Sequence, residues 1–212
     1  MFRFATPIIA IALASACSSS GSPSDLRYYQ FNNNQTDISS VSQVREQTQY
    51  LLRLSPIKVH GTLNNRAMVI KLSEHEIYSA NSHFWADAPA QMLVSYTQTQ
   101  LMRQLNNVLV VKGADVYAEQ LESAFFQLDI DVEQFNAGLD NNAEIAGLWR
   151  LSKVDNKGKL HVLKIARFAH TEPLADDGYG ELAKALEGAW KNSISEMSTD
   201  INTLIAKENM AN

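Results

Sequence analysis

Alternation of apolar and polar residues predicts a series of β-strands along this chain. The clearest alternation covers residues 124–135, AFFQLDIDVEQF, where large apolar side chains alternate with Gln, Asp and Glu. A strand with this pattern buries one face and exposes the other to water. Pro56 would make a second strand an edge strand or a bulged one, because proline has no backbone N–H to donate. Shorter runs rich in aromatic and β-branched residues predict further strands at 26–31, 50–59, 67–72 and 76–79.

A meander of three antiparallel strands is predicted in the second half of the chain. Residues 143–154 and 159–169 are apolar runs on either side of the sequence DNKG, in which Asn156, Lys157 and Gly158 favour a tight hairpin turn. Asn141 and Asn142 favour a preceding turn, after the strand that ends at residue 135. We therefore expect these three strands to pair in sequence order.

Two segments have helical periodicity instead. Residues 89–106 repeat large apolar side chains at helical intervals, with Asp87 placed to cap the helix and Pro89 suited to its first turn. Residues 179–206 form a longer amphipathic helix. Its apolar stripe contains Leu182, Leu186, Ala189, Trp190, Ile194, Met197, Ile201 and Leu204. The predicted fold class is α+β: a two-layer domain with a mainly antiparallel β-sheet covered by two helices.

The first 17 residues, MFRFATPIIAIALASAC, have the pattern of an export signal. Arg3 precedes a short apolar run, and small residues lead to Cys17, which is the only cysteine of the chain. We expect residues 1–16 to be a signal peptide and Cys17 to carry fatty acyl chains such as palmitate. The alternative is an ordinary signal peptide followed by a free thiol. Ser18 in place of Asp favours sorting to the outer membrane, with the protein on its periplasmic face.

Residues 17–25 form a Ser/Gly/Pro-rich tether, and residues 26–212 form a single domain. The polar stretch 32–47 is predicted to be a loop with a short helical turn. Hydrophobic residues make up 45% of the 212-residue chain and charged residues 19%, which is enough apolar surface for a core. The formal charge of -5, without a block of Lys and Arg, argues against a nucleic-acid partner.

No pattern in the chain supports catalysis or metal binding. Glu74, His75, Glu76 and His83 are the densest group of ligand types, but on a strand His75 would point away from its two neighbours. Asp129 and Asp131 lie on the wet face of a predicted strand, and solvation explains them. Nucleophile-elbow, phosphate-loop and dinucleotide motifs are absent from the sequence. We therefore predict that the protein is not an enzyme and has no cofactor and no metal site. The remaining histidines, His60, His161 and His170, are scattered and are predicted to be surface residues.

A contact surface is the better candidate for function. Tyr78, Phe84 and Trp85 lie where a strand leads into the first helix, and exposed aromatic residues there would anchor a partner. The alternative is that Trp85 fills the gap between helix and sheet. The stripe of the last helix is predicted to be core, with a lipid groove beside it as the minor alternative.

The order of several motifs resembles the auxiliary lipoprotein family of ABC-type intermembrane transport. The motifs are YYQF, RAMVIKLSEHEIYSANSHFWADAPAQML, QLDIDVEQF, the pair GLWRL and VLKIARF, and the C-terminal helix. The resemblance covers roughly residues 26–204. It implies a non-catalytic outer-membrane lipoprotein that docks onto a periplasm-spanning MCE-domain protein, works with its inner-membrane partners, and supports lipid transport and outer-membrane integrity.

Two other functions remain open at this stage. The first is a stand-alone periplasmic lipoprotein that binds a lipid or another ligand. The second is a hydrolase or cell-wall enzyme, which would depend on Glu74 or Asp131. The sequence leaves the oligomeric state open, and a homo-oligomer is compatible with it.

Overall fold

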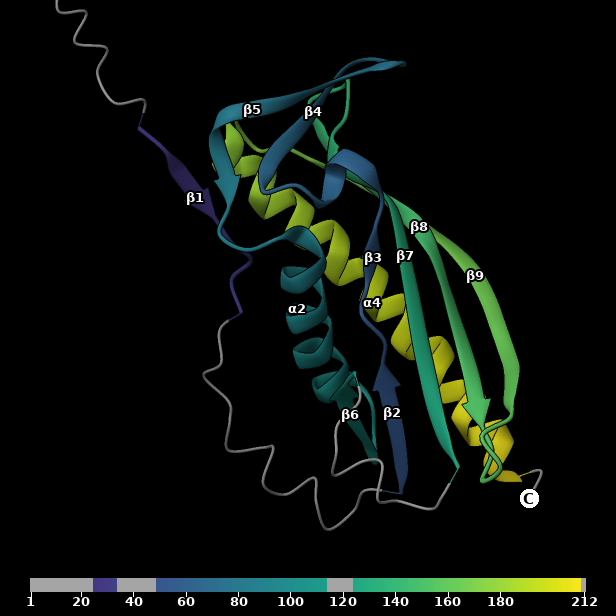
Figure 1. Ribbon diagram of the computed structural model, residues 1–212. Helices are drawn as coiled ribbons and strands as arrows, with labels where there is room; N and C mark the ends of the chain where they lie inside the picture. The colour runs from purple at the N-terminus through teal and green to yellow at the C-terminus, as the bar shows by residue number, and fades with distance from the viewer. Residues whose placement is uncertain (1–24, 34–48, 114–123, 211–212) are drawn as a thin grey trace, which may run out of the picture.

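A nine-stranded β-sheet and two long helices form the two layers of the domain in the part of the chain that the structure describes (Figure 1). The structure is a computed structural model, and it describes residues 25–33, 49–113 and 124–210. The strands are β1 (Arg27–Tyr29), β2 (Tyr50–Leu54), β3 (Lys58–Val59), β4 (Ala67–Ser73), β5 (Glu76–Trp85), β6 (Val108–Lys112), β7 (Phe125–Ala137), β8 (Asn142–Val154) and β9 (Leu160–Pro173). The helices are α2 (Pro89–Gln104), α4 (Tyr179–Met210) and the short 3-10 helix η2 (Gly61–Asn64). The predicted α+β class is confirmed.

The predicted meander is present, with β9 at an edge of the sheet and β7 joined to the shorter strands. Strands β7 and β8 pair antiparallel over almost their whole length, and β8 and β9 do the same. Inward-facing residues of β7 such as Leu128 and Val132 are completely buried, whereas Glu133 on the other face is exposed. Asp155, the first residue of DNKG, also stabilises the turn, because its carboxylate accepts hydrogen bonds from the backbone N–H groups of Lys157 and Lys159.

The shorter strands join this meander mostly in parallel. Strand β2 lies between β6 and β7 and is parallel to both, and β1 is parallel to the end of β5. Strands β4 and β5 form an antiparallel hairpin that touches β7 through the parallel pair Ile70 and Ala137. The apolar pattern did not predict β6, because a run of four apolar residues shortly after a helix has no periodicity that separates it from that helix.

Pro56 interrupts the second predicted strand. The expectation of one edge or bulged strand was wrong, since β2 ends at Leu54, β3 begins at Lys58, and β2 has a partner on each side. Both β2 and β3 pair with β7. The proline therefore stands in a short gap where no ladder hydrogen bond is required of it.

Helix α2 begins at Pro89 as predicted, but Asp87 does not cap it. The N-cap residue is Ala88, which makes no side-chain hydrogen bond, so the predicted cap was wrong. The side-chain oxygen of Asn64 in η2 instead accepts a hydrogen bond of 3.2 Å from the backbone N–H of Ala90. A donor at the helix start is thus satisfied from another element, which the local sequence did not reveal.

Both helices lie on one face of the sheet and contact each other. Helix α4 packs against β8 and β9, and α2 packs against β6. The indole N–H of Trp190 donates a 3.1 Å hydrogen bond to the hydroxyl of Thr97, and both residues are completely buried. The stripe predicted on the last helix is core, as expected.

Several predictions lie outside the described residues. They are the signal peptide at 1–16, Cys17, the tether except Asp25, and nearly all of the predicted loop at 32–47.

Gly147 provides a test of the close packing between β7 and β8. A Cβ atom at this position would lie 2.1 Å from the backbone oxygen of Asp131 and 2.8 Å from the ring of Phe168. We expect Gly147→Ala to lower the free energy of unfolding by about 3 kcal/mol, measured by urea denaturation, because the strand backbones must separate. Gly188→Ala, at a position within α4, is the control, since its Cβ would meet no atom closer than 3.8 Å. That substitution should raise stability by about 1 kcal/mol, and a loss of similar size in both variants would contradict the prediction.

Candidate functional site

At one end of the domain, the first described strand lies beside several exposed apolar side chains. Strand β1 pairs with the last residues of β5 at this end, and Figure 1 shows the start of α4 and the β4–β5 hairpin there too. Large apolar side chains are about half exposed in this region. They are Leu26, Tyr28, Leu72, Ile77 and Leu139, with Tyr78 at 38%. We call this region the β1 end.

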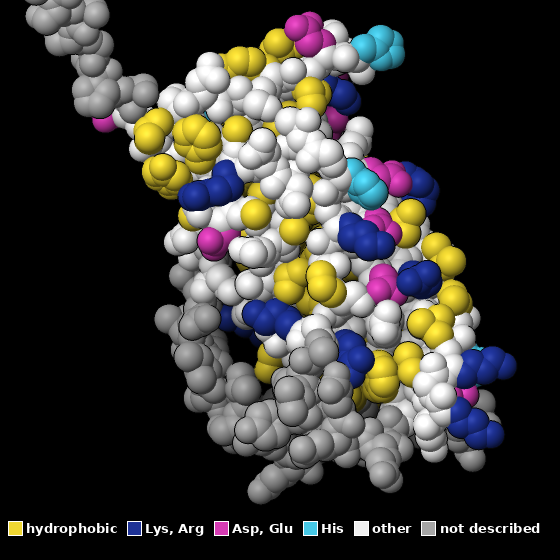
Figure 2. Space-filling model, viewed as in Figure 1, with side chains coloured by type: hydrophobic (Ala, Val, Ile, Leu, Met, Phe, Trp, Pro, Cys, Tyr) yellow, Lys and Arg dark blue, Asp and Glu magenta, His cyan; other side chains and the backbone are white. Residues whose placement is uncertain are grey.

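Tyr28, Phe84 and Arg66 form an aromatic cluster at the β1 end. The rings of Tyr28 and Phe84 have centroids 5.9 Å apart, and the guanidinium of Arg66 lies 5.5 Å from the centre of the Tyr28 ring. Arg66 is held in place because it donates hydrogen bonds to the backbone oxygens of Trp85 and Ala86, at 3.1 and 2.7 Å. Figure 2 shows hydrophobic side chains next to a basic one on the side of the molecule that carries β1. The cluster is therefore an ordered and accessible surface.

The three residues predicted as a contact surface do not form one surface. Trp85 is 2% exposed and packs against the rings of Phe31 and Phe135, so it fills the space between sheet and helices, as the alternative proposed. Phe84 is half-buried in the aromatic cluster. Tyr78 lies on the β4–β5 hairpin, six residues before Phe84, which corresponds to about 20 Å along the strand. Trp85 is thus corrected from a contact residue to a core residue.

His83 links three elements behind the aromatic cluster. Its ring stacks on Tyr179 of α4 with centroids 4.0 Å apart, and its Nδ1 atom lies 2.8 Å from the hydroxyl of Tyr29 in β1. Burial lowers the pKa of His83, and the positive charge of Arg27 lowers it further. Burial also raises the pKa of the Tyr179 phenol. Folding therefore favours the neutral form of the His83 imidazole.

An apolar groove of about 350 Å³ opens where the sheet extends past the start of α4. We call it the end groove. It is lined by Ile70, Lys71, Ala137, Gly138, Leu139, Asn141, Leu174, Gly178, Tyr179 and Leu182. Leu139 in this lining is 49% exposed, and Leu72, two positions after Ile70 on β4, is 52% exposed. The groove can receive an apolar group from outside the protein.

A polar cavity of about 560 Å³ adjoins the end groove. It is lined by Arg27, Tyr29, His83, Asp176, Asp177, Gly178, Tyr179, Gly180 and Glu181. Gly178 and Tyr179 line both spaces, so the Tyr179 ring that stacks on His83 stands at the boundary between them. One basic and three acidic residues line the polar cavity, and the Glu181 carboxylate lies 3.5 Å from the ammonium of Lys184.

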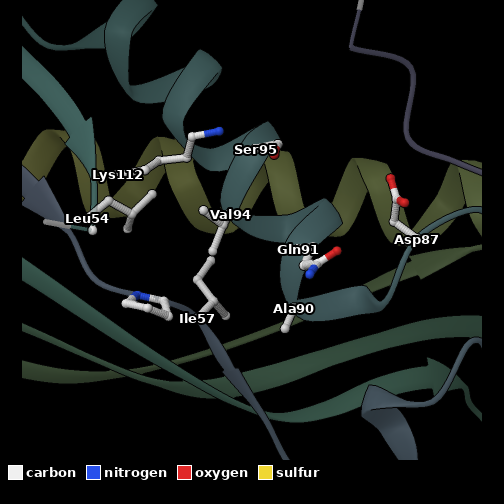
Figure 3. Close-up of a pocket in the computed structure, with 10 residues that line it drawn as sticks. Leu54, Ile57, Asp87, Ala90, Gln91, Val94, Ser95 and Lys112 are labelled. Atoms are coloured by element: carbon white, nitrogen blue, oxygen red, sulfur yellow. The ribbon is translucent and has the colours of Figure 1, made fainter. Parts of the chain in front are cut away.

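A second groove, of about 500 Å³, lies between α2 and the β2–β3 segment. Figure 3 shows Leu54, Ile57 and Val94 near one another in it, whereas Asp87 lies apart at the far end. Lys112 and Gly113, at the end of β6, also line this groove.

The candidate catalytic groups are engaged in surface contacts. Burial raises the pKa of Asp129, but hydrogen bonds from Ser55, Arg150 and Gln127 outweigh this effect, and its pKa lies below the ordinary value. Arg150 donates to this carboxylate at 2.8 Å. Asp131 lies 3.9 Å from the ammonium of Lys58. The lowered pKa of Asp129 makes its carboxylate a weak general base.

The predicted ligand-type residues do not converge. Glu74 and His75 form the exposed turn of the β4–β5 hairpin, and His83 lies at the other end of β5. Within the described ranges, no group of three or more His, Cys, Asp or Glu side chains is placed to hold a metal ion. His60 and His161 are exposed, and His170 is half-buried 3.3 Å from Glu196. None of the helices in the described part of the chain is both long and apolar enough to cross a membrane.

The chain belongs to the family of ABC-type transport auxiliary lipoprotein components, which it matches over residues 29–198. The resemblance found in the sequence motifs is thereby confirmed. The intermembrane transport lipoprotein PqiC of Escherichia coli K12 is 28% identical over 205 residues, which cover 96% of this chain and 100% of that protein. The protein of the same name from Shigella flexneri matches to the same extent.

Two crystal structures share the fold. One, of an uncharacterized protein, has a TM-score of 0.65 with 22% identity and covers 82% of this chain and 97% of its own. The other, of a protein from Xanthomonas campestris, has a TM-score of 0.62 with 13% identity and covers 77% and 90%. At these identities the likeness concerns the fold alone.

Sequence reasoning missed Tyr28, Tyr29 and Tyr179 as members of the site. The YYQF motif was visible, but it indicated only a strand. Tyr179 was the first residue of a predicted helix, and nothing local connects it with His83, 96 positions earlier by numbering. Two adjacent tyrosines at the start of the predicted domain were the available signal.

The environment of His83 predicts a loss of stability in mild acid. Because its pKa is lower in the folded state than the unfolded value of 6.5, protonation favours the unfolded chain as the pH falls through and below that value. His83→Phe should remove this contribution, so the free energy of unfolding will depend less steeply on pH between pH 7 and the folded pKa. Urea denaturation at a series of pH values measures the slope. His75→Phe, at the exposed hairpin turn, should leave the slope unchanged, and an equal change in both variants would contradict the assignment.

Proposed function

We infer that this protein is a lipid-anchored component of the outer membrane that assists an MCE-type intermembrane lipid transport system without catalysing a reaction itself. The observation that carries this proposal is the family match over most of the domain, together with a full-length relative described as an intermembrane transport lipoprotein. In this role the protein contacts a periplasm-spanning MCE-domain protein and contributes to the integrity of the outer membrane.

The anchor in this proposal is Cys17. The apolar leader, the small residues before the cysteine and the absence of any other cysteine from the sequence support acylation there. Multiple acyl chains would hold the protein on the periplasmic face of the bilayer, because each buried methylene contributes about 0.8 kcal/mol. Ser18 supports retention in the outer membrane.

The aromatic cluster is the surface we assign to the MCE partner. It retains Phe84 from the predicted contact residues and adds Tyr28 and Arg66. Tyrosine and arginine are the residue types most enriched among residues that dominate binding energy, and Tyr28 is 56% exposed. Arg66 is already oriented by two backbone carbonyls, so little side-chain entropy is lost on binding.

The second candidate function is a stand-alone lipid-binding lipoprotein. The end groove favours it, because an apolar space of about 350 Å³ suits part of a hydrophobic ligand. Under this alternative the protein, expressed in cells without any MCE-domain protein, would still carry lipid and act on the envelope. Under the leading proposal its deletion sensitises the outer membrane only when the MCE protein is present.

Cys17→Ala tests the anchor. We expect the variant to lack the mass of the acyl chains and to leave the membrane fraction, because the rest of the sequence offers no second attachment site of this kind. Intact mass spectrometry and fractionation of cell envelopes measure both effects. Ser18→Ala, one position away, is the control and should remain acylated. An unacylated wild-type protein in cells that process lipoproteins would overturn the anchor.

Tyr28→Ala tests the partner surface. The detergent-solubilised wild-type lipoprotein should co-purify with the MCE-domain protein, and we expect the variant to bind it about tenfold more weakly because an exposed anchor is removed. Quantitative co-purification measures the loss. Ile165→Ala, at a residue 63% exposed on β9, is the matched control and should bind normally. Normal binding by Tyr28→Ala and by Phe84→Ala would exclude the aromatic cluster, and no co-purification of the wild type would reject the proposal.

A further inference from the structure

The end groove and the polar cavity share two lining residues, and we treat them together as one amphipathic space. Gly178 and Tyr179 line both, so the apolar half and the charged half meet at the Tyr179 ring. This ring is fixed by its stacking on His83, at 4.0 Å between centroids. A ligand that spans the two halves must have an apolar part joined directly to a charged part.

The apolar half is open toward the outside. Leu139, which lines it, is 49% exposed, whereas Leu182, which also lines it, is 2% exposed. The groove therefore continues from a solvent-facing edge to the core between sheet and helix. A flexible hydrocarbon chain that entered from the rim would replace water along the whole path.

The charged half has groups of both signs. Arg27 is the basic residue of its lining, and Asp176, Asp177 and Glu181 are the acidic ones, with Glu181 3.5 Å from the ammonium of Lys184. An anion alone would meet a majority of like charges, and a simple cation would meet the guanidinium. A zwitterionic group satisfies both, with its phosphate toward Arg27 and its amine toward the carboxylates.

The anchor brings this end of the domain close to a bilayer. Asp25, where the described chain begins next to Leu26 and β1, lies eight positions after Cys17. Fully extended, these eight positions span about 25 Å, so an acylated Cys17 keeps the β1 end within that distance of the lipid surface. The amphipathic space thus lies at the end of the protein that lipids can reach.

We propose that the end groove and the polar cavity together bind one phospholipid of the anchoring bilayer, with an acyl chain in the groove and an ethanolamine-type zwitterionic headgroup in the cavity. This site rests on the proposed lipid anchor at Cys17 and deepens the proposed function by naming the ligand class. It differs from the aromatic cluster, which remains the surface for the protein partner. Occupation of the site would hold the domain at a defined orientation on the membrane.

Photo-crosslinking in vesicles tests the site. The full-length acylated protein is placed in phosphatidylethanolamine vesicles that contain a phosphatidylethanolamine with a diazirine in one acyl chain. After illumination, peptide mass spectrometry should find adducts concentrated in residues 137–141 and 174–182, the segments that contain most of the residues lining the end groove. Adducts spread evenly over the exposed surface, or concentrated on β9, would overturn the proposal.

Two charge substitutions test the two halves. Leu139→Glu places a carboxylate at the rim of the groove and should lower adduct yield about tenfold, because a charged side chain opposes entry of a hydrocarbon chain. Its control is Leu160→Glu, at a leucine 41% exposed beside the β8–β9 turn, which should leave the yield unchanged. Arg27→Glu should lower the yield about threefold because the phosphate loses its guanidinium. Its control is Lys159→Glu in the β8–β9 turn. Unchanged yields in both test variants would reject the site.

The choice of probe lipid tests the headgroup. A phosphatidylglycerol probe with the same acyl diazirine should label the groove about threefold less than the phosphatidylethanolamine probe, because its anionic headgroup meets three carboxylates without an amine. Equal labelling by both, or by a diazirine fatty acid, would overturn the assigned headgroup. Acylation and co-purification with the MCE protein are measured on the same samples. A preparation that is acylated and binds the MCE protein but gives no groove adduct rejects this inference alone, whereas an unacylated preparation rejects the proposed function.

Discussion

The burial of the inner face of the β7–β9 meander under α4 is the constraint on which the rest of the structure depends. Trp190 is completely buried, its ring lies 5.7 Å from that of Phe168 in β9, and its indole N–H reaches Thr97 in α2. One side chain thus joins the sheet and both helices. Because protein interiors are close-packed, these contacts fix the direction of α4. The position of its first residue, Tyr179, follows from that direction.

The position of Tyr179 explains why the apolar surface collects at one end. Helix α4 begins there, but the β4–β5 hairpin and the β7–β8 turn continue past it (Figure 1). The inner face of the sheet therefore loses its cover, and Ile70 and Ala137 line an open groove instead of a closed core. The same start of α4 supplies the ring that stacks on His83, so the groove, the polar cavity and the attachment of β1 have a common cause.

The sequence predicts what depends on local periodicity and leaves out what depends on tertiary pairing. The meander, its turns and both helices follow from alternation, turn chemistry and an apolar stripe. The parallel addition of β2 and the existence of β6 do not, because pairing between distant segments leaves no local pattern. The site divides in the same way. The sequence indicated exposed aromatic residues near Phe84. It could not separate Phe84 from Trp85, because the two side chains point to opposite faces of β5, and only the face that carries Trp85 is buried.

The distribution of charge indicates which kind of recognition each face supports. On the outer face of the meander, Arg150 pairs with Asp129, Lys58 lies 3.9 Å from Asp131, and Arg167 pairs with Glu133, so opposite charges largely cancel one another locally. A surface of this kind attracts neither anions nor cations over a distance and costs free energy to desolvate. The β1 end presents half-exposed apolar and aromatic side chains, whose burial is favourable against either a protein or a lipid. Association at this end therefore relies on removal of water from apolar area, and specificity comes from the few polar groups beside it: Arg66 in the aromatic cluster, and Arg27 with three carboxylates in the polar cavity.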